Sequence, residues 1–487
     1  MSLWAEFVGG FYTTRSQIMG ADQAVNIYTE TREVPGSPKE VTMYGTPGRK
    51  LETTLATQRC RGWFTQDQQT WVVVGNVLYE RTAPAVYVSR GVILDDGLDV
   101  FFASNGLGGN QLAIAGGGQI KVLNLVTNAL TLVALPFSNP VTIVFQDGYG
   151  LTNQLNTPTI WFSHLEDFTT WDALDFITRS NTSDNVIALA ISRDRLFVLG
   201  SKVVNLFYDS GNALNPWVPY PGTSTQVGCL SAYSVRVHND LVYWLGQSAQ
   251  GEPKVVSCKT DMQVVILSTP PIVDFFAACT ATNDVSLLVY SQDGHTFAVF
   301  TAPSSPADVK TYAWDVLEKR WSARAGFDAV TGRYTRWNAA GVTATGNTVL
   351  VGDPVSGAVY TLDLTTYTDA GGILKRERTA PYPSAENQWG FVKSFELGTQ
   401  AGVGTASGQG SAPMVEFFLS RDGAQTFISA GAKPLGAQGQ YLTRTKWAPL
   451  GRARLDRLVM RTIQTDPAPC VWGPGAWVQI EQGTGQL

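Results

Sequence analysis

Carboxylate pairs are the first residues of this chain whose chemistry could be catalytic. They occur at Asp95–Asp96 and Glu166–Asp167. A retaining glycosidase needs two carboxyl groups about 5–5.5 Å apart in space, on the floor of a cleft. Adjacent residues of a strand point to opposite faces, so neither pair is suited to act as acid and nucleophile. We expect both pairs to lie in solvated loops.

Histidines and cysteines are sparse, and their spacing does not suit a metal site. None of His164, His238 and His295 lies near a cysteine or a second histidine at the spacing of zinc ligands. The sequence also lacks the G-x-S-x-G elbow of a hydrolase triad. We therefore expect no catalytic residue, no metal and no cofactor. The cysteines are odd in number and lack a C-x-x-C pair, which indicates reduced, buried thiols; they are Cys60, Cys229, Cys258, Cys279 and Cys470.

One motif resembles the Asp-box, S-x-D-x-G-x-T-W. It reads SRDGAQTF over Ser420–Phe427, with Ala424 in place of the glycine and Phe427 in place of the tryptophan, and Ser291–Phe297 is a shorter relative. The motif could belong to a sialidase-like glycosidase. However, its aspartate is suited to accept backbone N–H bonds, with the aromatic side chain packed beneath, so we interpret it as a structural turn.

Charge gives no reason to expect a protein that binds DNA independently of sequence. The formal net charge is −5, whereas such proteins are usually basic. Basic residues gather at Leu374–Arg378 and at Arg452, Arg454, Arg457 and Arg461. Without interleaved aromatic residues for base stacking, a solvated or subunit-facing strand is favoured over a nucleic-acid track.

Composition leaves two interpretations of the surface open. Only 15% of the residues are charged and 11% are aromatic, against about 25% charged in average domains. Either partners cover much of the surface, or the chain is a large β-protein with aromatic cores. No apolar run reaches the roughly 18 residues of a membrane span. The start lacks the pattern of a signal peptide, so we expect synthesis in a cytoplasm.

The elements that would position these residues belong to a repeat. An apolar run, a Gly-led turn and a second apolar run recur, a pattern typical of β-hairpins whose turn residues allow φ > 0. About seven units at a spacing of roughly 40–50 residues predict the blades of a β-propeller, six- or seven-bladed, that closes into a ring. The five clear copies are Thr70–Glu80, Gln111–Asn124, Arg195–Tyr208, Leu241–Ser257 and Thr348–Asp363, with turn glycines Gly75, Gly116, Gly200, Gly246 and Gly352; the degenerate copies are Asn156–Leu174 and His295–Leu317.

The chain divides into three expected parts, all of them β or irregular. Residues 1–52 read as an N-terminal arm, and residues 53–380 carry the propeller. Residues 381–487 hold four alternating strands, which predict a β-sandwich or an extra sheet packed on the ring. Within this part, Gln400–Ala412 is rich in small residues and reads as a flexible loop or linker.

Several segments, spread in order over nearly the whole chain, form one further pattern. It begins near the N-terminus, with Asn26–Tyr28 and the turn at Pro47–Gly48, and continues to an Arg-rich C-terminal strand. The segments are Gly9–Glu30, Gly45–Thr54, Ser192–Ala213, Thr311–Gly326, Gly346–Asp363 and Arg452–Ile463. This ordered set resembles the phage stabilisation proteins, the packaged-DNA stabilisation or tail nozzle proteins of short-tailed phages (podoviruses).

The resemblance implies a structural virion protein rather than an enzyme. Such proteins form a homo-oligomeric ring, commonly a hexamer, below the portal and its adaptor. The ring continues the DNA channel, helps to retain packaged DNA and supports tail fibres, tailspikes or a needle. Genomic double-stranded DNA would pass through the lumen without sequence-specific binding, and the protein would be located in the virion tail after synthesis in the host cytoplasm. The alternative from another class is a propeller protein of the virion that binds or cleaves glycans.

Overall fold

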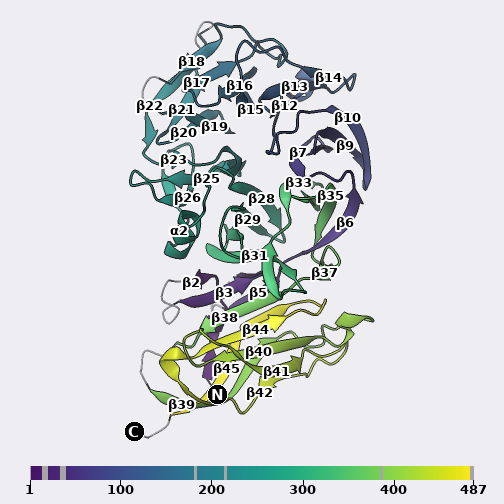
Figure 1. Cartoon of the computed structure of the whole chain (residues 1–487), viewed down its shortest axis with the longest axis vertical. Helices are drawn as coiled ribbons and strands as arrows, with labels where there is room; N and C mark the ends of the chain where they lie inside the picture. Colours follow the sequence, from purple (N-terminus) through teal and green to yellow (C-terminus); the bar gives the residue numbers. More distant parts are fainter. Residues whose placement is uncertain are drawn as a thin grey trace.

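The computed structural model describes residues 2–13, 20–32, 40–179, 184–212, 216–383 and 388–482. They form two β-rich bodies along the long axis of the molecule, a ring of sheets and a smaller sandwich (Figure 1). Apart from short helical turns, the described residues hold one helix of two turns, α2 (Pro270–Ala277). In this described part, no helix is long and apolar enough to cross a membrane.

The ring is a β-propeller, as the repeat predicted. Seven antiparallel sheets can be counted around it in the described residues, and each begins with an innermost strand. The seven expected units fall one in each blade, although Asn156–Leu174 is displaced by one strand, because the tight hairpin of its blade lies at 149–162. In chain order the blades are β7–β10 (Cys60–Gln66, Gln69–Val74, Val77–Ala83, Val86–Val92), β11–β14 (Phe101–Ser104, Gln111–Gly116, Gln119–Asn124, Leu130–Leu132), β15–β18 (Pro140–Gln146, Tyr149–Gln154, Thr159–Phe162, Phe176–Thr178), β19–β22 (Val186–Ser192, Arg195–Gly200, Val204–Asp209, Trp217–Thr225), β23–β27 (Gly228–Cys229, Arg236–His238, Leu241–Gln247, Pro253–Cys258, Val264–Ile266), β28–β31 (Ser286–Gln292, His295–Thr301, Thr311–Asp315, Arg320–Asp328) and β33–β35 with β6 (Ala340–Thr345, Thr348–Gly352, Ala358–Asp363, Gly48–Thr54).

The recurring glycine serves packing more often than turn geometry. Gly75 has φ = 54°, as a turn residue requires, whereas the other four predicted turn glycines do not have positive φ. Gly352 ends β34, and a Cβ on it would lie 2.2 Å from the Sγ atom of Cys60 in the neighbouring blade. At Gly200 a Cβ would lie 2.4 Å from the guanidinium of Arg179. The expectation that all five glycines supply φ > 0 is therefore wrong, because at most of them a side chain of the adjacent blade or loop fills the space over the glycine.

The ring is closed by the N-terminal part of the chain. β6 pairs antiparallel with β35, with Thr54 opposite Ala358 and Gly48 opposite Asp363. The last blade thus takes its fourth strand from a segment roughly 310 residues away in sequence. This pairing covers the open edge of β35 and joins the first and last blades of the ring.

The second body is a sandwich built from both ends of the chain. Its sheets face each other through aromatic side chains, with the rings of Phe395 and Phe417 stacked 4.5 Å apart and Trp447 5.0 Å from Phe417. One sheet orders β4 (Ile27–Arg32), β5 (Glu40–Gly45), β45 (Val471–Gln482), β39 (Trp389–Thr399) and β42 (Thr445–Trp447), with β1 (Ser2–Trp4) on β45 and β43 (Gly451–Arg454) on β39; the other orders β3 (Ala21–Val25), β38 (Arg376–Pro381), β44 (Val459–Gln464), β40 (Met414–Ser420) and β41 (Ile428–Pro434).

The two bodies share backbone as well as side-chain contacts. β3 pairs with β38 of the sandwich and also runs parallel to β31, the last strand of a propeller blade, at Val25 and Ala323. Residues 1–52, expected as a separate arm, instead supply β1, β3, β4 and β5 to the sandwich and β6 to the propeller. Residues 400–412 lie against the sandwich: a Cβ on Gly410 would lie 2.4 Å from the carbonyl oxygen of Pro467.

Candidate functional site

The carboxylate pairs singled out in the sequence both stabilise loops. In the connection between the first two blades, Asp96 pairs with Arg61 at 2.5 Å and accepts the backbone N–H of Leu98 at 3.0 Å. Arg61 is fully buried and also donates to the carbonyl oxygen of Leu94 at 2.8 Å. Asp95 lies 3.6 Å from the same guanidinium. This pair therefore anchors the loop between two blades.

The second pair shows the same structural use. Asp167 accepts bonds from the Thr169 backbone at 2.9 Å and from the Gln111 amide at 2.9 Å. Burial alone would raise the pKa of Asp167, but the hydrogen bond from the Thr169 hydroxyl, together with these two bonds, lowers it to about 2. Glu166 has a positive φ of 59° and donates its N–H to the Gly148 carbonyl at 2.7 Å. The expectation of simple solvated loops thus misses the dense hydrogen bonding that fixes these turns.

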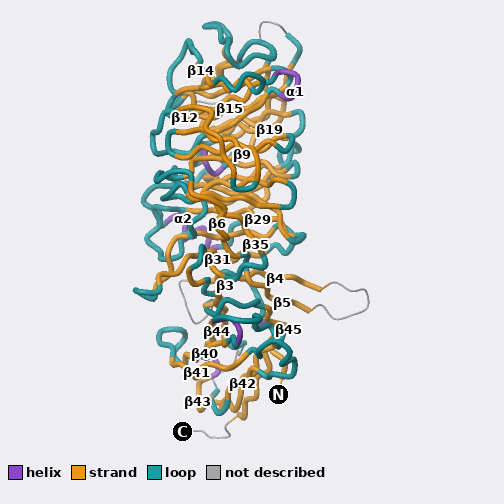
Figure 2. Tube along the Cα trace, turned by 90° about the vertical axis from the view of Figure 1, so that its right-hand side faces the viewer, coloured by secondary structure: helices purple, strands orange, loops and turns teal. Residues whose placement is uncertain are grey.

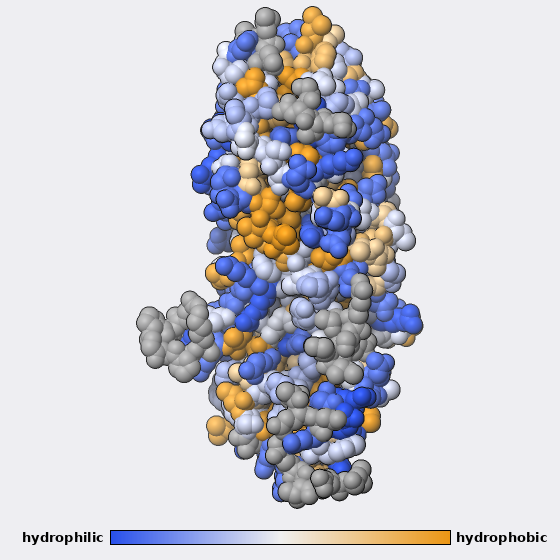
Figure 3. Space-filling model, turned by 90° about the vertical axis from the view of Figure 1, so that its left-hand side faces the viewer, coloured by the Kyte–Doolittle hydropathy of each residue, from blue (hydrophilic) through white to orange (hydrophobic). Residues whose placement is uncertain are grey.

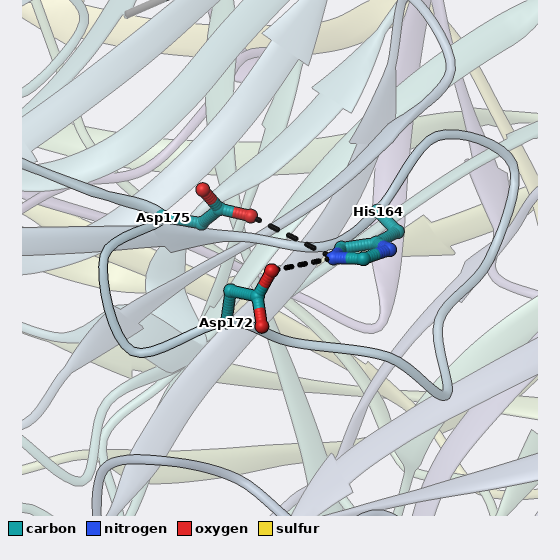
Figure 4. Close-up of side chains that lie close together, drawn as sticks. All are labelled: His164, Asp172 and Asp175. Carbon is teal, nitrogen blue, oxygen red and sulfur yellow. Dashed lines mark hydrogen bonds and ion pairs between the residues drawn. The ribbon is translucent and has the colours of Figure 1, made fainter. Parts of the chain in front are cut away.

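Among the described residues, the structure gathers one group of possible metal ligands that the sequence did not indicate. His164, which follows β17, lies in a loop with Asp172 and Asp175, and the three ligand atoms lie within 4.8 Å of one another (Figure 4). His164 Nε2 is 2.9 Å from Asp172 Oδ2 and 4.0 Å from Asp175 Oδ2. The hydrogen bond to Asp172 raises the pKa of His164, and burial together with Asp172 raises that of Asp175.

The group offers one nitrogen and two carboxylate oxygens, an arrangement that also forms an ordinary ion pair. Its histidine and Asp172 are about half or more exposed. Residue spacings of eight and three within an irregular loop carry no periodicity that a sequence pattern could reveal. The other two histidines lie outside this group: His238 lies 3.2 Å from the Ser291 hydroxyl, and His295 lies 2.7 Å from Asp315.

The Asp-box-like segment is a structural turn, as predicted. It joins β40 to β41, and Asp422 accepts the backbone N–H groups of Gln425 and Thr426, both at 3.0 Å. These bonds and the one from the Thr426 hydroxyl hold the pKa of Asp422 well below its usual range. Phe427 lies beneath the Arg461 guanidinium, 3.6 Å from ring centroid to cation.

The basic segments are not one surface. Arg376 and Arg378 are buried, each about 1% exposed, between the sandwich and the N-terminal strands, so the expectation of solvated or subunit-facing residues is wrong for them. Arg461 is tied to Glu377 at 3.0 Å, and Arg452 lies over Trp389 at 4.5 Å. The burial of Arg376 and Arg378 could not be predicted from the sequence pattern. Alternation along β38 directs both side chains to one face, towards backbone carbonyls that only the tertiary structure brings near.

Exposed apolar residues mark a surface suited to protein contacts. β27 is the outer strand of its blade, and its Val265 and Ile266 are 54% and 55% exposed. The space-filling view of this side of the molecule shows an apolar patch at mid-height (Figure 3). An outer strand with an apolar face is a favoured site of association.

A groove lies next to this strand, where the propeller meets the sandwich. It has a volume of about 530 Å³, and its walls include Leu267, Trp314 and Trp321 from the propeller and Gly9–Tyr12 from the N-terminal segment. Close by, the β4–β5 hairpin projects from the body (Figure 2). The junction therefore combines an apolar outer strand, a groove and a projecting element.

Comparison with known proteins identifies a family model that matches most of the chain. Residues 7–367 match the family described as Bacteriophage P22 Gp10, beta-propeller. No match was found among the curated proteins. Among solved structures, the extracellular domain of the putative hybrid two component system BT4673 from B. thetaiotaomicron is 11% identical, with a TM-score of 0.44 over 80% of this chain and 45% of that chain. The N-terminal domain of Nup159 is 10% identical, with a TM-score of 0.40 over 70% of this chain and 98% of that chain.

Proposed function

The chain belongs to the phage stabilisation family, the β-propeller proteins of the bacteriophage P22 Gp10 type, and we propose that it forms a nozzle ring in a short phage tail. The family match, which covers 361 of 487 residues (7–367), is the observation that carries this proposal. The resemblance and the propeller expected from the sequence are thereby confirmed. Membership of this family fits a structural protein rather than an enzyme.

In the proposed assembly, six copies surround a lumen below the portal and its adaptor. A closed ring needs heterologous contacts, in which one surface of each copy meets a different surface of the next. The exposed outer strand β27 with the adjoining groove supplies one such surface, and the projecting β4–β5 hairpin supplies an element that can reach a neighbour. Both lie at the junction of the two bodies, which supports packing of neighbouring copies at this level.

The lumen of the ring would conduct double-stranded DNA and help to retain it after packaging. A strongly basic wall would bind phosphates and slow the exit of DNA. The net charge of −5 supports a lumen without such a wall. We further propose that the ring carries tail fibres, tailspikes or a needle, is located in the virion tail and is made in the host cytoplasm.

The alternative of a glycan-processing propeller lacks support in the residues that suggested it. Asp422 is engaged by turn hydrogen bonds, and Asp96 and Asp167 are engaged in the same way. Hydrolysis of a bacterial surface polysaccharide by the purified protein, abolished by exchange of one carboxylate, would favour this alternative.

The proposal is tested by asking whether ring formation depends on the apolar outer strand β27. We expect negative-stain electron microscopy and native mass spectrometry of the purified protein, alone or with its adaptor, to show closed rings. Ile266→Glu should disperse them, because it places a charge in the apolar contact. Leu174→Glu is the matched control, since Leu174 is 86% exposed in a loop of the third blade. A wild-type protein that stays monomeric and does not join portal–adaptor complexes would refute the proposal.

A further inference from the structure

A second cavity lies where the propeller meets the sandwich, and it shares no wall residue with the groove described above. Its volume is about 180 Å³. The sandwich contributes β4, β5, β38 and the start of β45 to its wall, and the propeller contributes the turn between β28 and β29 and the segment after β35. The wall residues with an oxygen or nitrogen in the side chain are Tyr28, Tyr44, Thr46, Asp293, Tyr367 and Arg376.

Arg376 is the one basic residue among the described residues of this wall, and most of its donors are unsatisfied. It is 1% exposed. Gly45 makes room for it, because a Cβ there would lie 2.7 Å from Nε of the arginine. Nη1 donates to the Ala468 carbonyl at 3.3 Å, and that oxygen also accepts the Gln464 amide at 3.1 Å. Nε is buried without a hydrogen-bond partner in the described chain, although a guanidinium has five N–H donors to satisfy.

The groups nearest to Arg376 do not neutralise its charge. Burial lowers the pKa of Arg376, and only the Cys470 thiol and the Tyr367 hydroxyl act against this. Burial in turn raises the pKa of Cys470 to about 12, so the thiol is neutral at neutral pH. The guanidinium therefore lies beside uncharged groups.

The acidic residues of the surrounding elements are either engaged or exposed. Glu377 and Asp369 already form ion pairs with other arginines. Asp293 is the one carboxylate among the described wall residues, and both it and Glu30 on β4 are exposed and hydrated. None of these four carboxylates forms an ion pair with Arg376 in the part of the chain that the structure describes.

Arg378, two residues along the same strand, shows the contrast with a compensated arginine. It is buried to the same extent, but it pairs with Asp22 at 2.7 Å and donates to several backbone carbonyls. A buried charge is costly unless it is paired. Because Arg376 lines a cavity instead of meeting a carboxylate, its counter-ion is expected to enter that cavity.

We propose that this cavity binds a small carboxylate that pairs with Arg376. The planar fork of an arginine matches the two oxygens of a carboxylate. A singly charged anion suits one guanidinium, whereas Asp293 in the wall would repel a dianion such as phosphate more strongly. At about 30 Å³ per water molecule, the volume corresponds to roughly six waters, which is room for a small free acid. The exposed wall residues Asp293 and Leu364 give access from solvent.

The test is titration of the full chain with trifluoroacetate at neutral pH, followed by ¹⁹F NMR, with chloride used to hold ionic strength constant. We expect a saturable change of the ¹⁹F signal that acetate reverses. Arg376→Gln should weaken binding by about tenfold or more, the loss of one charge-assisted interaction. Asp293→Asn should strengthen binding, because it removes the carboxylate that repels the anion. Arg193→Gln is the matched control, since Arg193 is 62% exposed and pairs with Asp240 on the surface.

Three results would overturn the proposal. The first is a wild-type protein without saturable binding of trifluoroacetate. The second is an affinity that Arg376→Gln and Asp293→Asn leave as unchanged as Arg193→Gln does; the exposed Asp293 keeps this comparison valid if Arg376→Gln does not fold. The third is displacement of trifluoroacetate by inorganic phosphate at lower concentration than by acetate, which would refute the carboxylate as the preferred class of ligand.

Discussion

Replacement of Arg378 by methionine should release the N-terminal strands from the sandwich while leaving the propeller folded. Arg378 is about 1% exposed and donates to the backbone carbonyl oxygens of Phe7 at 2.6 Å and Gly10 at 2.8 Å. It also pairs with Asp22 at 2.7 Å. Methionine keeps most of the apolar volume but removes every donor, so the two carbonyls and the carboxylate lose their partner.

The free-energy cost of Arg378→Met follows from these contacts. Removal of one partner of a buried ion pair costs about 3–5 kcal/mol. The Asp22 side chain is 28% exposed and regains part of its hydration, which favours the lower end, about 3 kcal/mol. The best readout is hydrogen exchange of the β3 amides, because a chain with two bodies need not unfold in a single step. At 1.4 kcal/mol per tenfold change, protection in β3 should fall by about a hundredfold.

Arg444→Met is the matched control for this experiment. Arg444 makes a two-pronged pair with Glu396, at 2.8 and 2.6 Å, but its side chain is 67% exposed. Exposed pairs contribute about 0–1 kcal/mol, so β3 protection should stay close to that of the wild type. Equal losses of protection in the two variants, or a loss below about fivefold in Arg378→Met, would refute the view that Arg378 holds the N-terminal strands on the sandwich.

Two further predictions concern the propeller. Gly352→Ala should lower the free energy of unfolding, measured with urea, by about 1–3 kcal/mol, because the added methyl group overpacks against Cys60. Gly108→Ala is the control: a Cβ there meets nothing within 4 Å, so the free energy of unfolding should not fall. The hydrogen bond to Asp315 raises the pKa of buried His295 above 6.5 despite its desolvation, so its stabilisation is full below pH 6.5 and is lost as the pH rises through the folded-state pKa. The melting temperature of the wild-type protein should therefore decline over this pH range, and His295→Gln should remove the decline. A melting-temperature profile that His295→Gln leaves unchanged would contradict this reasoning.

The repeat could be found from the sequence because it depends on local pattern. An apolar run with a glycine at or next to its end recurs in five of the seven blades, as at Gly200 and Gly352, and such patterns need only neighbours in the chain to be recognised. The origin of the outer strand of the last blade could not be found in this way. β6 carries the polar residues Arg49, Lys50 and Glu52, and the sequence places most of it in the N-terminal arm. Its pairing with β35 is set by contacts about 300 residues away.

The sequence by itself determined the class of the protein: a ring of hairpin blades, turns made by residues such as Asp422, and the family to which they belong. Only the tertiary structure decided how charged residues are used. Arg378 was indistinguishable from a surface arginine until β3 and β38 met, and Arg376 came to line a cavity only when the propeller and the sandwich came together. The physical reason is that burial and charge compensation depend on distances in space, which local sequence pattern does not contain.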